Sequence, residues 1–450
     1  MGPEEARHLL VRTGFEARIA DIDSLAPLTR EAAVERILAG TRTSARTPFP
    51  EGTLDWVAPR RFREAGPEER KRLRQELVER GLALKAWWIG EMLATDSPLT
   101  ERMTLFWHNH FTSSLQKVRS SALMARQNEL LRRHALGSFA TLLHAASKDP
   151  AMLVYLDGAR SRRGKPNENF AREVMELFTL GEGRYGELDI REAARAFTGW
   201  SVEPDSGEYR WRPMLHDEDD KRVLGYVGNW RGEDVLDILL AEPATAEFVV
   251  AKLWKEFISP QPDPREVARI AGRFKASTYQ VKVALRELLL SPAFWAPENR
   301  GALVKSPVEL VVGTLREFEV RVPDPLPFAF LLRTLGEDLF SPPNVKGWPG
   351  GEAWINSSTL LARKQFTERL LRVDEVRFVP AMESGGSPMA PMRRRFLQAI
   401  GELEFSSAAW RAPFREREEM IPLTLLALPA AARKSLDPRD LVADPVYQLK

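Results

Sequence analysis

Apolar residues recur at intervals of three and four positions along most of the chain, which predicts amphipathic helices. The segments with this period are Leu28–Ala39, Pro67–Ala94, Pro98–Phe111, Ser121–His134, Ser138–Ser147, Glu168–Leu180, Asp189–Thr198, Asp234–Leu240, Thr245–Phe257, Arg265–Lys275, Gln280–Leu290, Pro307–Phe318 and Ser358–Leu371. Ser97 and Ser306 each place a hydroxyl cap before a first-turn proline, and Asn167 can cap the helix that follows it. The pattern therefore predicts a mainly α protein with a multi-helix globular domain.

The strand signal is confined to residues 201–230, where glycines mark turns. Within this stretch we expect Glu208–Trp211 and Arg222–Tyr226 to form one small β hairpin or a long irregular insert. Pro and Gly cluster at residues 341–351, which predicts a loop, and again at residues 382–391, which predicts a flexible connection. We therefore expect a main helical domain over residues 1–375 and a C-terminal helical appendage over residues 376–450.

The 450-residue chain is 44% hydrophobic and 28% charged, as in ordinary soluble globular proteins. It has no cysteine, which excludes disulfides, zinc ribbons, iron–sulfur clusters and thiol nucleophiles. The formal charge of +2 argues against nucleic-acid binding along the whole chain. The nucleotide-binding and hydrolase motifs GxGxxG, Walker A, GxSxG and HExxH are absent. No apolar run reaches the length of a transmembrane segment, and the first residues do not resemble a signal peptide, so we expect a cytoplasmic protein.

The segment FWHNHF, residues 106–111, holds two of the six histidines of the chain, His108 and His110. In a continuous helix their side chains point about 200° apart, because each residue turns about 100°, and they cannot bind one ion together. If the helix ends near Trp107, an extended His-x-His places both imidazoles on one side, where they could bind a metal. The alternative is a helix end packed by aromatic residues, with both histidines hydrogen-bonded to the backbone.

A second candidate lies in the predicted helix that begins at Glu168. Glu173 and Glu176 are three positions apart on one face, with Arg172 beside them. Two neighbouring carboxylates repel each other unless a cation or a shared proton lies between them. The pattern therefore predicts a metal site or a general acid–base pair in which Arg172 orients the carboxylates. The alternative is a solvated face on which Arg172 relieves the repulsion.

Two further segments carry candidate binding residues. His216 and Asp217 open an acidic run, HDEDDK, which suits a hard cation and could add ligands to a metal. The alternative there is a solvated turn. The Pro- and Gly-rich loop continues into a segment with three residues that could form a weak ligand platform: Lys346, Trp348 and Trp354. The alternative is that the two tryptophans fill space in the core.

Three motifs occur in order along the chain: FWHNHF (106–111), PNENFAREVMELFTLGEG (166–183) and SPPNVKGWPGGEAWINSSTLLAR (341–363). With them the chain resembles, over nearly its whole length, the bacterial "domain of unknown function 1800" proteins. This resemblance implies no activity. It implies that relatives are often exported, which leaves the compartment open. It also implies that their genes often lie beside those of proteins similar to sulfatases and alkaline phosphatases, so such a protein is a candidate partner.

The leading hypothesis is a metal-dependent enzyme, hydrolytic or oxidative, in which Glu173, Glu176 and Arg172 carry the catalytic chemistry. A divalent zinc, manganese or iron ion would be bound by His108, His110, Glu173, His216 and Asp217. The alternative is a non-catalytic helical scaffold that binds a partner protein or a cell-envelope polymer. The enzyme needs an open pocket where the His and Glu segments converge. The scaffold needs the same groups paired and closed, with Arg172 bridging Glu168 or Glu176.

Overall fold

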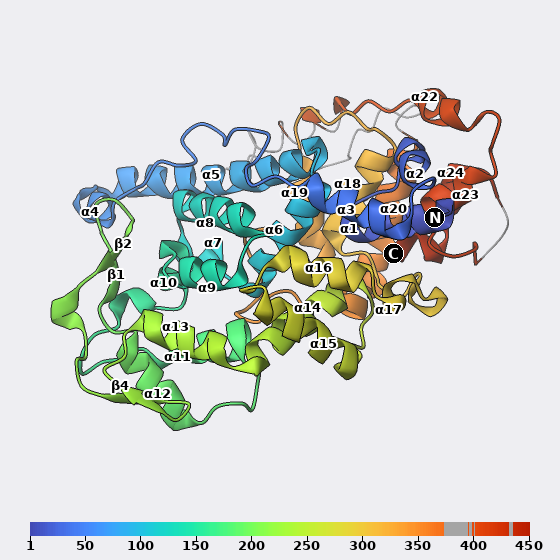
Figure 1. The fold of residues 1–450 in the computed structure, drawn as a ribbon. Helices are drawn as coiled ribbons and strands as arrows, with labels where there is room; N and C mark the ends of the chain where they lie inside the picture. Colours follow the sequence, from blue (N-terminus) through green and yellow to red (C-terminus); the bar gives the residue numbers. More distant parts are fainter. Residues whose placement is uncertain (373–394, 396–397, 400, 432–434) are drawn as a thin grey trace.

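The computed structural model describes residues 1–372, 395, 398–399, 401–431 and 435–450, and it is mainly helical, as the sequence predicts (Figure 1). The first half contains α1 (Pro3–Thr13), α2 (Ile19–Leu25), α3 (Arg30–Ala39), α4 (Pro59–Glu64), α5 (Pro67–Ala94), α6 (Pro98–His110), α7 (Leu115–Val118), α8 (Ser121–His134), α9 (Phe139–Ser147), α10 (Pro150–Tyr155), α11 (Glu168–Glu173) and α12 (Glu187–Ala196). The second half contains α13 (Gly232–Ala241), α14 (Pro243–Phe257), α15 (Pro264–Ala276), α16 (Val281–Leu289), α17 (Pro292–Trp295), α18 (Pro307–Glu317), α19 (Leu326–Leu335), α20 (Ser357–Leu370), α22 (Ser407–Arg411), α23 (Met420–Leu425) and α24 (Pro438–Ala443). None of these described helices combines the length and the apolar character that a membrane crossing requires.

Short helical turns join the α-helices. The 3-10 turns are η1 (Gly158–Arg160), η3 (Pro213–Leu215), η4 (Pro297–Asn299), η5 (Gly351–Trp354), η6 (Ala412–Phe414) and η7 (Pro445–Gln448), and η2 (Val174–Thr179) is π-helical. Two of the three predicted helix caps are confirmed: Asn167 caps α11, and Ser306 forms a capping box with Glu309 at α18. The predicted Ser97 cap of α6 is wrong, because its hydroxyl instead accepts a hydrogen bond from the backbone N–H of Arg42 (3.1 Å).

Among the described residues, the β-strands form two hairpins in the region for which the sequence predicts one small hairpin or an irregular insert. The antiparallel pairs are β1 (Trp200–Val202) with β2 (Tyr209–Trp211) and β3 (Lys221–Val223) with β4 (Tyr226–Gly228). Leu224 and Gly225 both have positive φ, 49° and 87°, as a two-residue hairpin turn requires. Each strand therefore pairs across a short turn, which costs less chain entropy than joining the two segments that were expected to pair.

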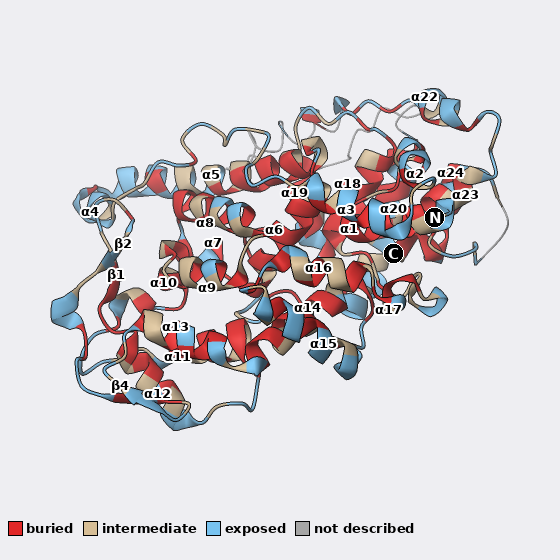
Figure 2. Ribbon diagram, viewed as in Figure 1, coloured by how far each residue is buried: buried red, intermediate tan, exposed pale blue. Residues whose placement is uncertain are grey.

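One continuous hydrophobic core extends through the described residues, from α1 to the turn at η7 (Figure 2). Arg7 of α1 donates hydrogen bonds to the carbonyl oxygens of Thr424 and Leu425 (3.2 and 3.3 Å), and the hydroxyls of Thr314 and Tyr447 are 2.8 Å apart. The described part of the C-terminal segment thus packs into the same core as α1 and α18. The predicted domain boundary at residues 375–376 and the predicted flexible stretch at 382–391 lie outside the described residues.

An ion pair deep in this core links α6 to α8. Arg132 donates from Nε and Nη2 to the Glu101 carboxylate (2.6 and 2.8 Å), and Trp88 Nε1 donates to the same carboxylate (2.9 Å). Neither charged side chain is more than 1% exposed. Because both charges have left water, removal of one partner would leave the other uncompensated in a medium of low dielectric constant.

We expect Arg132→Met to lower the free energy of unfolding by about 3–5 kcal/mol, because Glu101 then remains buried without its cation. The double variant E101Q/R132M should recover a large part of this loss, since a neutral amide can still accept the hydrogen bond from Trp88. Urea unfolding at neutral pH measures both changes. An R132M protein as stable as the parent, or a double variant less stable than R132M, would contradict this account.

Candidate functional site

Helix α6 continues without a break to His110, so the extended His-x-His geometry that a shared metal would need is not formed. His108 packs against the rings of Trp88, Phe340 and Trp348, with centroid distances of 5.6, 5.4 and 5.7 Å. Burial lowers the pKa of His108 to about 3. Its Nε2 is buried and has no hydrogen-bond partner among the described residues. His108 is thus a neutral ring in an aromatic environment.

His110 contacts a different part of the molecule. Its Nε2 lies 3.1 Å from the carbonyl oxygen of Phe178. Because a carbonyl only accepts, we assign the proton to Nε2, which leaves Nδ1 as an acceptor. Nδ1 is buried and has no partner in the part of the chain that the structure describes. Burial holds the pKa of His110 well below its usual value, and the positive charge of Lys252 lowers it further.

The carbonyl that His110 contacts belongs to the π-helical segment η2. Helix α11 ends at Glu173, and η2 continues it with hydrogen bonds such as Leu180 N–H to Met175 O (2.8 Å). The wider turn changes the side-chain directions that a regular helix would give. Phe178 lies near the end of this segment, where backbone carbonyls lack partners within the helix. Single π-helical turns occur frequently at functional sites.

The two predicted carboxylates are close together but have different environments. Burial raises the pKa of Glu173, and the charge of Glu176 raises it further. Glu176 accepts a hydrogen bond from a tyrosine hydroxyl (2.6 Å). Arg172 forms two hydrogen bonds to Glu187, each 2.9 Å. The expectation that Arg172 bridges Glu168 or Glu176 is therefore wrong. Its guanidinium is paired with Glu187, a residue that the sequence does not single out.

His216 and Asp217 are bound into the hairpin region. Asp217 accepts two hydrogen bonds from Arg195 (2.9 and 3.0 Å), which hold the pKa of Asp217 below its usual value. His216 Nδ1 lies 2.9 Å from the Thr198 carbonyl oxygen, and its ring packs against Trp211. Across the described residues, no three His, Asp or Glu side chains are grouped so that they could hold a metal ion. The structure does not bring the predicted ligand set together, and binding of zinc, manganese or iron stays a prediction.

Asn109 holds the loop at residues 344–354 against α6. Its Oδ1 accepts a hydrogen bond from Trp348 N–H (2.7 Å). Gly347 approaches the same amide with a φ of +82°, and a Cβ there would lie 2.1 Å from Asn109 Oδ1, so a side chain does not fit. Trp348 and Trp354 are 4% and 6% exposed. The two tryptophans are therefore packed and do not form an open platform.

A cavity of about 400 Å³ lies beside this loop and α6. Its basic residues are Arg102, Lys252, Lys255, Lys346 and Lys450, and its acidic residues are Glu256, Glu309 and Glu337. Asn109, His110, Trp348 and Trp354 also line it. The charge of Lys346 acts on Glu173, which belongs to the second motif. Parts of all three sequence motifs thus meet at or beside one cavity. Glu173 and Glu176, the carboxylates on which the enzyme hypothesis depends, do not line it.

Three of the five basic side chains in this cavity are paired with carboxylates. The pairs are Arg102 with Glu256 (2.5 Å), Lys450 with Glu309, and Lys346 with Glu182 (2.9 Å). Lys252 and Lys255 have no carboxylate partner among the described residues. The Lys252 ammonium lies 5.3 Å from the centre of the Phe248 ring. Burial, together with the smaller effect of the Lys255 charge, lowers the pKa of Lys252 to about 8.

Lys252 is absent from the residues that the sequence singles out. It stands in α14 within FVVAKLWKEF, where lysine at the edge of an apolar face is ordinary. Glu256 follows at i+4, a spacing that usually permits an ion pair. In the fold, Glu256 instead accepts a hydrogen bond from Arg102 of α6. Only this tertiary contact, which no local pattern indicates, leaves Lys252 unpaired.

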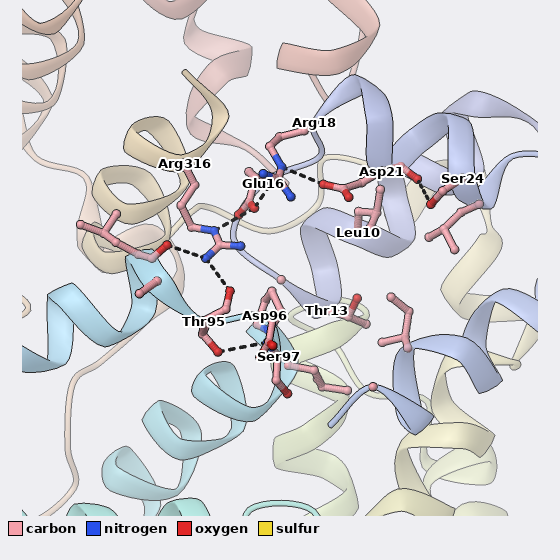
Figure 3. Close-up of a pocket in the computed structure, with 18 of the residues that line it drawn as sticks. Leu10, Thr13, Glu16, Arg18, Asp21, Ser24, Thr95, Asp96, Ser97 and Arg316 are labelled. Atoms are coloured by element: carbon pink, nitrogen blue, oxygen red, sulfur yellow. Dashed lines mark hydrogen bonds and ion pairs between the residues drawn. The ribbon is translucent and has the colours of Figure 1, made fainter. Parts of the chain in front are cut away.

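A second cavity, of about 720 Å³, lies among α1, α2, α3, the end of α5 and α18 (Figure 3). Its arginines already have partners. Arg316 donates to Glu16 (2.8 Å) and to three backbone carbonyls around the end of α5, and Arg18 donates to Asp21 (2.9 Å). Because these charges are satisfied within the protein, this cavity makes the weaker candidate for binding a charged ligand.

A family model with the description "Protein of unknown function (DUF1800)" matches residues 8–437 of the chain. The chain belongs to the DUF1800 family. Searches among curated proteins and among solved structures found no match. The family description assigns no activity to the DUF1800 proteins, so a function for this member has to be argued from the cavity and its charges.

Gly347→Ala is expected to destabilise the DUF1800 protein more than Gly350→Ala. Both glycines have positive φ, 82° and 72°, and Gly350 has a ψ of 179°, so alanine is strained at either position by about 1–3 kcal/mol. Only at residue 347 would the new Cβ also collide with Asn109. Urea unfolding of the two variants measures the difference, and equal losses of stability would contradict the proposed contact.

Acid should destabilise the protein partly through His108. The folded-state pKa of about 3 lies below the ordinary 6.5, so the unfolded chain takes up the proton first as the pH falls. The contribution of neutral His108 to the free energy of unfolding is complete above pH 6.5. It is lost below that pH, at up to about 1.4 kcal/mol per pH unit. His108→Phe should therefore flatten the acid side of the pH profile of the unfolding free energy. Parallel profiles for parent and variant would show that His108 is not held neutral.

Proposed function

We propose that the cavity beside α6 binds a small organic ligand that carries a carboxylate or phosphate group. The observation that supports this most directly is the state of its lysines. Lys252 and Lys255 line the cavity without a carboxylate partner, whereas the other basic side chains around it are paired. Lys255 is exposed, whereas the Lys252 ammonium is half-buried. Without a carboxylate partner among the described residues the half-buried charge is unfavourable, and a bound anion would supply the missing interaction.

The size and the wall of the cavity suit a small molecule. A volume of about 400 Å³ lies within the range of roughly 300–1,000 Å³ that is usual for small-molecule sites. Trp348 and Trp354 contribute apolar surface, and the contact with Asn109 fixes the loop that carries Trp348. The ligand would therefore have an acidic end and a short body, held in a largely preformed site.

The electrostatic potential in the cavity favours an anion. Glu256 and Glu309 are occupied by Arg102 and Lys450, so these four charges largely cancel. Burial raises the pKa of the third acid, Glu337, to about 7, so near neutral pH it is partly uncharged. The net positive potential then comes mainly from the two unpaired lysines. In a partly buried site such a potential attracts anions more strongly than on an open surface.

Replacement of the two lysines should weaken anion binding. We expect isothermal titration with citrate and with inorganic phosphate, at low ionic strength, to show saturable binding by the parent protein. The K252M/K255M variant should bind about tenfold more weakly or worse, because one charge-assisted hydrogen bond contributes roughly 1.5–3 kcal/mol. K71M/K282M removes the same total charge from two exposed positions and should bind like the parent.

The protein for this titration is treated with a chelator beforehand, because the proposed site uses only side chains of the chain itself. Urea unfolding of each variant establishes that the fold is kept. Equal affinities for the two double variants would place any anion elsewhere, and no binding of either probe to the parent would contradict the proposal. Binding that appears only after zinc, manganese or iron is restored would favour the metal-dependent hypothesis instead.

A further inference from the structure

We infer that Lys252 is a reactive amine that forms an imine with the carbonyl group of a 2-oxo acid bound in the cavity. This inference rests on the proposed function and adds to it a substrate class and a chemical role for one residue. The basis is the half-buried position of Lys252 at the wall of a cavity that suits an organic acid, with a second lysine, Lys255, lining the same cavity.

The surroundings of Lys252 disfavour its charged form. The side chain is half-buried, which disfavours the charge. Its Nζ also lies over the Phe248 ring, one helical turn earlier on α14 and 5.3 Å from the ring centre, a cation–π contact that offsets part of this penalty. Lys255 lies about one turn further along and repels a second positive charge. The carboxylate spaced to neutralise Lys252, Glu256, is bound to Arg102. Desolvation and a neighbouring cation both make a lysine release its proton more readily.

Only the neutral amine attacks a carbonyl carbon, so the reactivity of a lysine depends on the fraction of its amine that has lost the extra proton. The pKa of Lys252 is lowered to about 8. About a tenth of the amine is then neutral at pH 7, against roughly one part in 2,500 for a lysine with the ordinary pKa of about 10.4. The pKa of Lys450, which lines the same cavity, is also lowered by burial, but its amine is buried and paired with Glu309. Lys252 therefore combines access to a ligand with a reactive protonation state.

A 2-oxo acid matches the remaining groups of the cavity. Its carboxylate can pair with Lys255, which lies three residues beyond Lys252 and therefore on a neighbouring part of the same helix face. Its carbonyl carbon is bonded directly to that carboxylate carbon. A ligand held by Lys255 through its acidic end thus carries its electrophilic carbon next to the group that Lys252 can reach.

The reaction balances without an oxidant or a reductant. Nζ of neutral Lys252 forms a bond to the carbonyl carbon while a proton moves from nitrogen to the carbonyl oxygen, which gives a carbinolamine. The hydroxyl then takes a proton and leaves as water, and the nitrogen releases its remaining proton as the C=N bond forms. Glu337 lines the same cavity, and its pKa of about 7 allows it to give and take such protons near neutral pH.

Reductive trapping tests this chemistry. The full chain is incubated with pyruvate and sodium cyanoborohydride, which converts an imine into a stable secondary amine, and peptide mass spectrometry locates the modified lysine. We expect the adduct to form mainly on Lys252 in the parent and in the control variant K71R. In K252R, which keeps the positive charge, trapped pyruvate should fall about tenfold or more, in proportion to the neutral amine removed. Acetone, which has the carbonyl but lacks the carboxylate, should label Lys252 less than pyruvate does.

The outcomes separate this inference from the proposed function. If the parent binds citrate or phosphate through the two lysines but pyruvate leaves Lys252 no more modified than Lys71, the imine is ruled out and the anion site stands. If K252M/K255M binds anions as well as K71M/K282M does, the proposed function itself fails. A K252R variant that traps as much pyruvate as the parent, while urea unfolding shows that its fold is intact, would also overturn the role of Lys252.

Discussion

Helix α6 is buried on nearly every side, so its polar side chains must find partners inside the protein. Four of them do so on four different elements. The contacts are Glu101 with Arg132 of α8, Arg102 with Glu256 of α14, Asn109 with the backbone of Trp348, and His110 with the backbone of Phe178 in η2. The polar requirements of one helix thereby fix the relative positions of segments that are far apart in the sequence.

The same constraint produces the charge imbalance in the cavity. Glu256 would be the natural i,i+4 partner of Lys252 on α14. Because Arg102 is buried on α6, it needs an acid, and Glu256 satisfies it. Lys252 and Lys255 are left at the cavity wall without a carboxylate. The unpaired lysines are therefore a consequence of how the core is stabilised, and they make the cavity suitable for an anionic ligand.

Much of the fold follows from local signals. Helices α5 and α8 begin and end where the apolar period predicts, and α18 begins at the predicted Ser306 cap. The pairing of short strands has no such local signal. Residues 208–211 could pair with the segment before them or with residues 222–226. The two-residue turn at 224–225 decides, because it pairs β3 with β4 and leaves β2 to β1. The π-helical turns of η2 also lack a local signal.

In the candidate site too, some residues can be predicted from local sequence patterns and others cannot. The sequence singles out His110, Lys346, Trp348 and Trp354, and the structure places all four around one cavity. The other candidates have partners elsewhere in the fold. His108 lies among aromatic rings, Asp217 is paired with Arg195, and Arg172 is paired with Glu187. Lys252 could not be found from the sequence, because what distinguishes it is the loss of a partner to a residue on another helix.

Lys252 lies in the cavity without an acidic partner among the described residues, and the pKa of its amine reports this state. The rate at which dilute acetic anhydride modifies Lys252, measured by mass spectrometry from neutral to alkaline pH, gives that pKa. We predict a midpoint of about 8 in the folded protein and a return to about 10.4, the ordinary value for lysine, after unfolding in urea. A midpoint near the ordinary value in both states would show that Lys252 is paired or fully solvated, and it would contradict the account.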